Sequence, residues 1–297
     1  MVSLKFLIIV DTTSLLFLFP CNIFIFMVNI LDWKKKRMLQ ISDVIITGIS
    51  VSNLVFGGMR LLRCFSIIYN ITSTIIVIFG FNLMSVSCNI WFSTWLCVYF
   101  CLKIVKIHNS FYIYLQRTFH KMLPWLLVLS VVESLLLSFY VAVNSSKREF
   151  FNGQLYSPTL NVSTSIQSAE VSFSLYLMFS LVALVLFASS CFTITYTLCR
   201  HIKVLKNNEQ GFQSSSTEAH IRATIIVVSL FVLCTMLFSN VTIAATKLLA
   251  DKIRHFIIVL NYVCGVLSYV GLIKGNSKLH KTLRKIIHRL TFSRPST

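Results

Sequence analysis

Charged residues, and acidic residues above all, are scarce in this 297-residue chain. Asp, Glu, Lys and Arg together make up 12% of the sequence and only nine residues are acidic, whereas 56% are hydrophobic and the mean hydropathy is +0.79. A soluble domain normally carries about 25% charged residues, most of them on its surface. This composition therefore excludes a soluble globular protein.

The sequence patterns that mark common enzyme sites are also absent. The chain has no Gly-rich phosphate loop, no His-Glu-x-x-His zinc site and no Gly-x-Ser-x-Gly nucleophile elbow. We therefore expect no enzyme activity, no cofactor and no metal site. Proline is rare as well, and only Pro20 lies deep within an apolar stretch. This argues against a transporter, because transporters usually combine internal repeats with broken helices.

The chain contains several long apolar stretches. Seven stretches approach or exceed the roughly 20 helical residues that cross a hydrocarbon core about 30 Å thick. They run over residues 6–31, 44–69, 75–105, 122–143, 171–198, 223–246 and 256–273. The sequence predicts an all-α membrane protein, with one seven-transmembrane helix bundle over residues 1–297.

Basic residues gather on one side of these stretches. If the first, third and fifth connections share a face with the C-terminal tail, that face holds 19 of the 27 Lys and Arg residues. The positive-inside rule then places the N-terminus outside and the C-terminus inside. Anionic headgroups attract each such cation by about 1 kcal/mol, so the lipid bilayer explains the charge of +18 and no nucleic-acid partner is expected. The tail over 277–290 alternates apolar and basic residues at helical spacing, which predicts an amphipathic helix on the inner leaflet.

The long connection predicted on the outer face, residues 144–170, has no cysteine, although the chain has nine. A disulfide from this connection to the outer end of the third stretch therefore cannot form. This argues against an ordinary rhodopsin-like receptor. Three Asn-x-Ser/Thr sequons on the predicted outer face, at Asn70, Asn144 and Asn161, are candidate glycosylation sites.

Four sequence blocks lie at or near helix ends on the basic face. They run from Asn22 to Arg37 with Ser42-Asp43, Gly48 and Ser52, and over 91–105, 217–223 and 272–279. In this order and register they resemble the bitter taste receptors (taste receptors type 2) over nearly the whole chain. The chain departs from that family's pattern at Cys21, Asn53, Ala183, 224–225 and 268–269.

The resemblance implies a G-protein-coupled chemosensory receptor of the plasma membrane. Such a receptor detects a small-molecule tastant, typically bitter, and activates a gustducin-type heterotrimeric G protein. The resemblance leaves open whether the chain acts alone or as a homo- or hetero-oligomer. A vomeronasal type 1-like pheromone receptor and a non-signalling seven-helix membrane protein or transporter stay as alternatives. Leu102-Lys103-Ile104 and Asp32-Trp33 favour the taste family over the vomeronasal one.

Polar and basic residues along the inner halves of the helices are candidates for the switch and for the G-protein face. They are Asn22, Asn53, Lys103, Arg200, His201, Lys203, Lys206, His220 and Arg222. By the resemblance, Lys103 ends the third helix and contacts the seventh helix or the G protein, although a lysine at this depth can also reach lipid phosphates. Asn22 and Asn53 would be buried and need partners, which each could supply to the other. Asp32 is expected to pair locally with Lys36 or Arg37.

The predicted fold places a ligand cavity between the outer halves of the third, fifth, sixth and seventh helices. Candidate lining residues are Asn82, Val86, Asn89, Phe173, Tyr176, Asn240, Lys247, Ile258, Asn261 and Tyr262. Aromatic and apolar walls with a few amides suit a small, partly apolar molecule. Asn82 and Val86 stand where the family has Trp and Asn, so ligand identity does not follow from the resemblance. Glu133, near the middle of the fourth helix, is expected to face the bundle in protonated or paired form.

Overall fold

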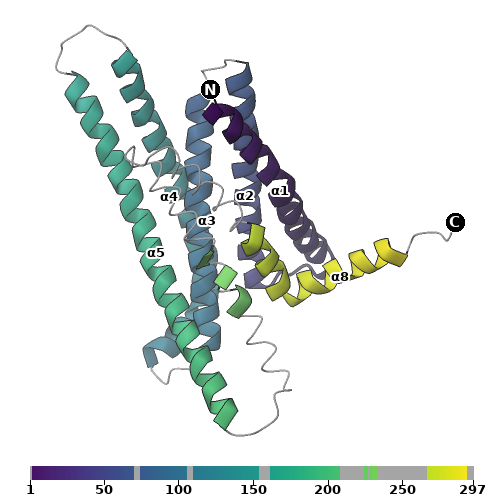
Figure 1. Ribbon diagram of the computed structural model, residues 1–297. Helices are drawn as coiled ribbons and strands as arrows, with labels where there is room; N and C mark the ends of the chain where they lie inside the picture. The colour runs from purple at the N-terminus through teal and green to yellow at the C-terminus, as the bar shows by residue number, and fades with distance from the viewer. Residues whose placement is uncertain are drawn as a thin grey trace, which may run out of the picture.

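The computed structural model describes residues 2–69, 74–105, 110–153, 161–207, 224–226, 228–229, 231–232 and 266–292, and these are helical apart from short turns. The long helices are α1 (Val2–Lys36), α2 (Ile41–Ile68), α3 (Ile75–Ile104), α4 (Ser110–Gly153), α5 (Asn161–Asn207) and α8 (Ser277–Phe292) (Figure 1). A shorter apolar helix, Val266–Gly275, precedes α8. The described fold is all-α, as the sequence predicts.

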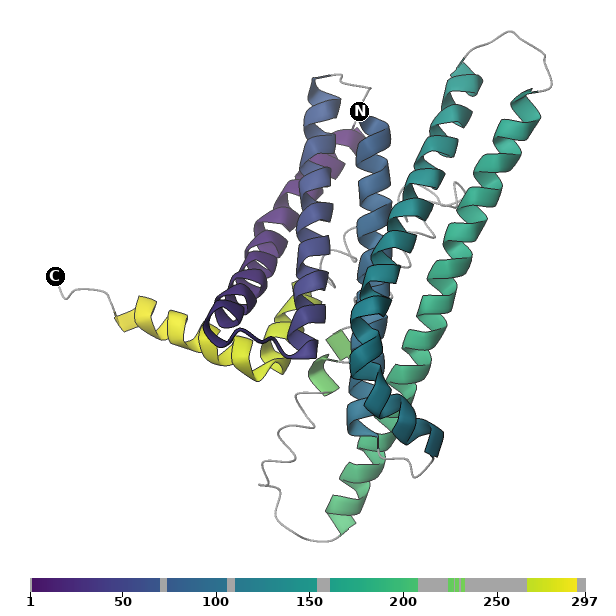
Figure 2. The same cartoon turned by 180° about the vertical axis from the view of Figure 1, so that it is seen from behind.

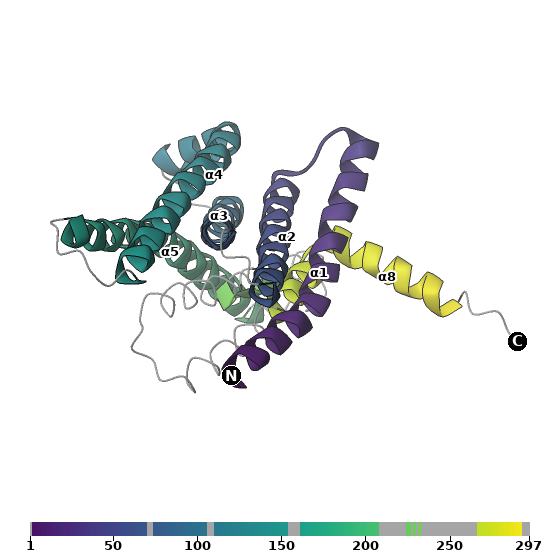
Figure 3. The same ribbon diagram turned by 90° about the horizontal axis from the view of Figure 1, so that it is seen from above.

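The centre of the bundle is α3. It packs against α2, α4 and α5, whereas α1 packs against α2 and α4 also packs against α5. Viewed from above, α4 and α5 lie on one side of α3, and α2 and α1 lie on the other (Figure 3). The apolar window of α3 is 61% buried, against 22–33% for the other four candidate spans. At one end of the bundle α8 lies crosswise beside α1 (Figure 2).

Small side chains let the helices approach α3 closely. A methyl group added at Gly48 of α2 would lie 2.9 Å from the ring of Phe92, and one added at Gly80 of α3 would lie 3.1 Å from the ring of Phe139 in α4. Thr94 has its hydroxyl 2.8 Å from the carbonyl oxygen one turn earlier, at Ile90. In a membrane such internal hydrogen bonds satisfy polar side chains that have no water to bind.

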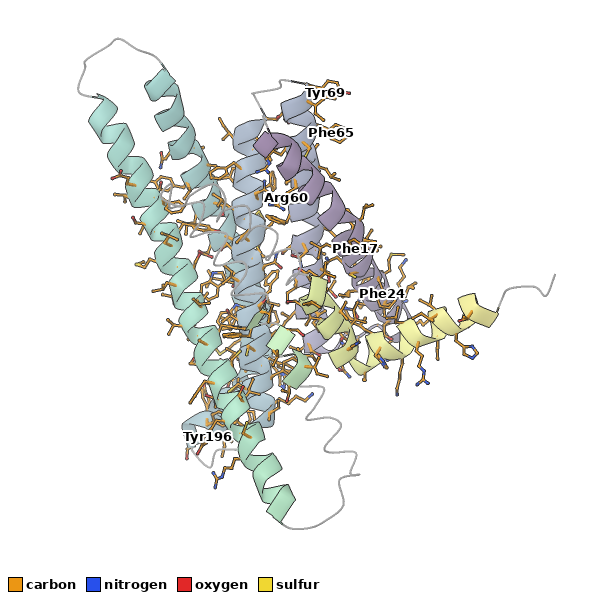
Figure 4. The ribbon with its side chains drawn as sticks, viewed as in Figure 1. Phe17, Phe24, Arg60, Phe65, Tyr69 and Tyr196 are labelled. Atoms are coloured by element: carbon orange, nitrogen blue, oxygen red, sulfur yellow. The ribbon has the colours of Figure 1, made fainter. Side chains whose placement is uncertain are left out.

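Large apolar side chains cover the outer surface of the bundle. Trp125 is 77% exposed and Phe192 74%. Phe17, Phe65 and Tyr196 are exposed as well, and they point away from the bundle (Figure 4). An apolar surface of this extent marks contact with a membrane. Five of the described helices are long and apolar enough to cross one.

The predicted spans 6–31, 44–69 and 75–105 lie within five residues of the ends of α1, α2 and α3. The spans 122–143 and 171–198 are much shorter than α4 and α5, because hydropathy marks only the part of a helix that suits hydrocarbon. No glycine or proline interrupts the polar flank 110–121, so the helix continues through it. The predicted outer connection is likewise helical over 144–153 and 161–170.

The sixth and seventh predicted spans, 223–246 and 256–273, lie mostly outside the described residues. Their described parts, within 224–232 and 266–273, are helical. The total of seven spans, and the placement of the N-terminus outside and the C-terminus inside, stay predictions. The amphipathic helix predicted over 277–290 matches α8, in which Leu279 is buried while Ile286 and Ile287 are exposed.

A left-handed residue ends α1. Arg37 has φ 57°, and its backbone N–H donates to the carbonyl oxygen of Trp33 at 2.8 Å. This geometry closes a helix and is usually given to glycine, because a side chain is strained there. The chain then turns within three residues into α2, which begins at Ile41.

Candidate functional site

One polar cluster joins α1, α2 and α8 at the end of the bundle where α8 lies crosswise. Lys278 is at its centre: its Nζ lies 2.9 Å from Oδ1 of Asn29, 2.9 Å from Oδ2 of Asp43 and 3.0 Å from Oδ2 of Asp32. We call these four residues and Asn276 the Lys278 cluster. One ammonium group thereby uses its three donors on two carboxylates and one amide.

Asn276 connects this cluster to the start of α8. Its Nδ2 donates to Oδ1 of Asp43 at 3.2 Å, and its Oδ1 accepts the backbone N–H of Lys278 at 3.1 Å. A side-chain oxygen that accepts from the first turn is the usual N-cap of a helix, and asparagine is among the preferred residues for this role. The same side chain thus starts α8 and fixes it to α2.

Buried partners complete the cluster inside the bundle. Asn29 is fully buried, and its Nδ2 donates to the hydroxyl of Thr47 at 2.9 Å. Asp43 is only 4% exposed, so its charge depends on Lys278 and Asn276 for compensation. Asp32 also pairs with Lys36 at 3.2 Å, which confirms the predicted local partner.

The sequence did not predict Lys278 as a member of this site. Asp43 lies at the start of an apolar stretch, and a buried carboxylate there requires a cation. The sequence therefore indicates that Asp43 needs a cation, but it does not say which of the seven basic residues in the tail pairs with Asp43. The answer depends on where α8 begins and how it crosses α1.

The predicted link between Asn22 and Asn53 is present in the geometry. Nδ2 of Asn53 donates to Oδ1 of Asn22 at 3.4 Å, and Nδ2 of Asn22 donates to the backbone oxygen of Leu18 at 2.8 Å. Asn22 is 1% exposed, whereas Asn53 is half-buried. The pair connects α1 to α2 about two turns deeper in the bundle than Asn29.

The basic candidates for the G-protein face are more dispersed. Lys103 is exposed near the end of α3, with its Nζ 5.7 Å from the ring centre of Tyr99, so its described contact lies on its own helix. Arg200 is exposed on α5. His201, Lys203 and Lys206 follow on the same helix, and their side chains lie outside the described residues, as do His220 and Arg222 altogether.

Towards the opposite end of the bundle, three predicted ligand residues share one face of α3. Asn82, Val86 and Asn89 are spaced by four and three residues, which places them above one another on a helix. Oδ1 of Asn82 and Oδ1 of Asn89 are buried and have no hydrogen-bond partner in the described part of the chain. Nδ2 of Asn89 donates to the backbone oxygen of Ser85 at 2.9 Å. Among the described residues, these two amide oxygens therefore have no hydrogen-bond donor.

Two aromatic residues of α5 lie beside this part of α3. Tyr176 is fully buried and its hydroxyl donates to the backbone oxygen of Leu83 at 3.0 Å. Phe173 is half-buried and stacks on Tyr176 with ring centres 6.4 Å apart. The five predicted ligand residues that the structure describes thus lie on α3 and α5, two helices that pack against each other. The other five, Asn240, Lys247, Ile258, Asn261 and Tyr262, lie outside the described residues.

Hydroxyl groups connect α3 to α4 in the middle of the bundle. Ser134 donates to the hydroxyl of Ser87 at 3.0 Å, and the indole N–H of Trp95 donates to Ser130 at 2.9 Å. Glu133 is half-buried: its Oε2 lies 3.4 Å from the hydroxyl of Ser134, and its Oε1 is buried without a partner in the described structure. Its carboxyl group therefore lies at the α3–α4 contact.

The sequons differ in their surroundings. Asn144 lies within α4 and its side chain is buried, with its Nδ2 unpaired among the described residues. Asn161 is the first residue of α5, and Asn70 lies outside the described residues. All three stay candidate glycosylation sites.

The apolar surface, the long helices and the polar cluster at one end define a multi-pass helical membrane protein. The family model described as taste receptor protein (TAS2R) matches residues 1–291. The chain therefore belongs to the type 2 taste receptors, which are bitter taste receptors and not enzymes.

Individual relatives agree with this assignment. Taste receptor type 2 member 7 of Macaca mulatta is 26% identical over 279 residues, which cover 90% of this chain and 87% of that protein. Member 9 of the same species is 27% identical over 90% of this chain and 88% of its own length. Member 43 of Macaca mulatta is 25% identical over 91% and 89%.

Proposed function

We propose that this chain is a G-protein-coupled receptor of the plasma membrane that detects small, bitter compounds and activates a gustducin-type heterotrimeric G protein. The observation that carries the proposal is the family match over residues 1–291. In this proposal the end of the bundle that holds the Lys278 cluster faces the cytoplasm, as the positive-inside rule predicts. The end that holds Asn82 faces outward.

The ligand site would lie beside the outer half of α3. The amide oxygens of Asn82 and Asn89 are hydrogen-bond acceptors, so they select ligands with N–H or O–H donors. Phe173 and Tyr176 contribute aromatic surface next to them. We therefore propose a small, partly apolar ligand with at least one donor, which Asn240, Lys247, Ile258, Asn261 and Tyr262 would contact from the opposite side.

Signal transfer would use the contact between α3 and α5. Oγ1 of Thr94 lies 3.1 Å from the backbone oxygen of Ala183, and Sγ of Cys97 lies 3.2 Å from Sγ of Cys191. A ligand that fits one arrangement of α3 and α5 better than another shifts the population towards that arrangement. The shift would change the inner surface that Lys103, Arg200, His201, Lys203, Lys206, His220 and Arg222 offer to the G protein.

The Lys278 cluster would hold α1, α2 and α8 in place during this movement. It joins α1, α2 and α8 through charge-assisted hydrogen bonds of 2.9–3.2 Å, which are stronger than neutral ones. Helices held in this way resist relative movement. The movement that opens the inner face would therefore concentrate in α3, α5 and the sixth predicted helix.

The direct test is to express the full chain with a promiscuous G protein and to record calcium release across a broad panel of bitter compounds. We expect at least one compound to give a saturable response in cells that display the chain at their surface. Silence across the panel at normal surface level would contradict the taste-receptor proposal. Uptake of a labelled compound without calcium release would favour a transporter, and a response to volatile pheromone-like compounds alone would favour the vomeronasal alternative.

One pocket variant makes this test specific. Asn261→Ala should shift the potency of an agonist without lowering the surface level, because it removes an amide from the proposed site. Arg117→Ala, which changes an exposed cation on α4 far from that site, is the matched control and should leave potency unchanged. An identical dose response for Asn261→Ala would remove this residue from the site.

A further inference from the structure

A cleft of about 120 Å³ lies between the end of α3 and the first turns of α4. The described residues that line it are Tyr99, Leu102, Lys103, Gln116, Phe119 and His120. The proposed function places Lys103 at the G-protein face but assigns no ligand to this cleft, which lies at the opposite end of α3 from Asn82 and Asn89. Figure 2 shows the beginning of α4 beside the end of α3.

The walls of the cleft are held in place from both helices. The hydroxyl of Tyr112 in α4 lies 3.1 and 3.0 Å from the backbone oxygens of Cys101 and Val105 and can donate to either, so the start of α4 is hydrogen-bonded to the end of α3. Phe119 is 4% exposed and forms the apolar base together with Leu102. The ring of His120 meets the ring of Tyr99 edge-on, with centres 6.1 Å apart.

The polar groups of the cleft can donate hydrogen bonds, and Lys103 gives the cleft a positive charge. Lys103 and His120 are exposed at the cleft, and Gln116 lies one helical turn before His120. The chain has no acidic residue between Asp43 and Glu133, and Glu133 is 13 residues further along α4 than His120, about 20 Å at 1.5 Å per residue. In the described structure Lys103 contacts the face of Tyr99 and no carboxylate.

We infer that this cleft binds the phosphate of an anionic phospholipid from the inner leaflet. The inference rests on the proposed orientation of the chain, in which this end faces the cytoplasm. A basic recess between membrane helices on the cytoplasmic side is the usual form of a site for phosphorylated lipid headgroups. The cleft holds a headgroup phosphate and not acyl chains, which would follow the exposed side chains of Met122 and Trp125 into the membrane.

Lys103 supplies the positive charge that would bind the phosphate. The Nζ of Lys103 lies over the Tyr99 ring, and the six described residues that line the cleft include no acid. A phosphate in the cleft would accept hydrogen bonds from Lys103 and from the Gln116 amide, both of which are donors. Occupation would tie α3 to α4 at the proposed G-protein face, so lipid composition would bias the receptor.

Lipid binding to the purified full chain tests the inference. Native mass spectrometry would measure the bound fraction of phosphatidylinositol 4-phosphate against phosphatidylcholine, in the original chain and in Lys103→Gln. We expect the charge-removing variant to bind the phosphoinositide at least fivefold more weakly. Lys121→Gln is the matched control, because Lys121 is an exposed cation one residue after His120 and does not line the cleft. It should change binding less than twofold.

A second variant keeps the test valid if Lys103→Gln is poorly folded. Gln116→Trp fills the cleft without changing the charge, and it should weaken phosphoinositide binding to a similar extent. Equal losses in Lys103→Gln and Lys121→Gln would overturn the inference, since they would indicate diffuse attraction to the basic surface. Unchanged binding in both cleft variants would overturn it as well.

Two soluble competitors separate a lipid site from a site for free anions. Inorganic phosphate and soluble inositol phosphate should displace the phosphoinositide only weakly, because they lack acyl chains. Full displacement by either at the lipid's own concentration would overturn the assignment to a lipid. The readout is binding and not signalling, so a receptor that proved silent in the calcium assay would still give an answer here.

Discussion

The two ends of the helix bundle satisfy their polar side chains in different ways. Where α1, α2 and α8 meet, Lys278 and Asn276 satisfy both carboxylates and the buried amide of Asn29. Towards the other end of α3, Asn82 and Asn89 keep buried oxygens without partners in the described structure. Buried polar atoms are nearly always paired in proteins, so unpaired ones are expected where a ligand completes the set. The comparison separates a hydrogen-bonded scaffold from the proposed ligand site.

The largest effect should follow from Lys278→Met. Among the described residues, the change leaves the buried charge of Asp43 with the Asn276 amide as its one side-chain partner, and breaking a buried ion pair costs about 3 kcal/mol. Thermal unfolding of the purified chain in detergent micelles should therefore occur at a clearly lower temperature. Lys281→Met removes an exposed lysine one turn beyond and should have little effect.

A double variant checks that the uncompensated charge is the cause. Asp43→Asn combined with Lys278→Met removes both charges and should recover a large part of the lost stability. If the single variant unfolded at the original temperature, the cluster would not be the scaffold that we describe.

A second, smaller effect should follow from Gly271→Ala. A methyl group there would overlap the hydroxyl of Ser229 and lie 2.9 Å from its Cβ, so the helix over 266–275 and the helical residues 228–229 would have to separate. Overpacking of this kind costs about 2 kcal/mol. Gly58→Ala is the matched control, because nothing lies within 4 Å of the added methyl group.

Thermal unfolding of the two glycine variants measures this difference. Only Gly271→Ala should be destabilised, and adding Ser229→Gly should restore its stability. A loss of the same size in Gly58→Ala would show that close packing is not specific to this contact.

Substitution of an amide at the proposed ligand site should leave stability nearly unchanged but lower the potency of an agonist. Asn89→Leu removes one buried oxygen that lacks a partner and one N–H that bonds within its own helix, so stability should stay within about 1 kcal/mol. The response to an agonist should nevertheless weaken about tenfold in potency, the equivalent of about 1.4 kcal/mol of binding free energy.

Calcium dose responses at matched surface level, together with thermal unfolding, measure both properties of this variant. Ser85→Ala changes only the neighbouring hydroxyl and serves as the control. Strong destabilisation with unchanged potency would indicate that Asn89 belongs to the scaffold and would remove the distinction between the two ends.

The smallest expected effect is a gain in stability. Arg37→Gly relieves the strain of a left-handed residue that carries a side chain, and it should stabilise the chain by about 0.5 kcal/mol after the greater freedom of glycine in the unfolded chain is included. Lys35→Gly, two residues earlier within α1, should instead cost about 1 kcal/mol. Unfolding temperatures that fall equally in both variants would contradict the role given to Arg37.

Much of the fold could be predicted from hydropathy. The prediction fails where a helix continues through polar residues. The ends of α2 and α3 agree with the predicted spans because polar residues follow directly on the apolar ones. The flank 110–121 contains Gln116, Arg117 and Lys121, which have good helix propensity, so α4 continues where hydropathy indicates an end.

The candidate site also has some contacts that the sequence predicts and others that require the folded structure. The pair of Asp32 and Lys36 is local in sequence and was predictable from spacing. The pair of Asp43 and Lys278 joins residues 235 positions apart, and it depends on the crossing of α8 over α1. The helical spacing of Asn82, Val86 and Asn89 predicts their shared face, but only the structure shows which of their atoms lack partners.

Agonist-dependent nucleotide exchange on a purified gustducin-type heterotrimer tests most directly whether the outer site of this bundle controls its inner face. The full chain in a lipid bilayer should accelerate exchange when the agonist is added, and Asn89→Leu should require about ten times more agonist for the same rate. An agonist that binds the chain without changing the exchange rate would contradict the proposed receptor.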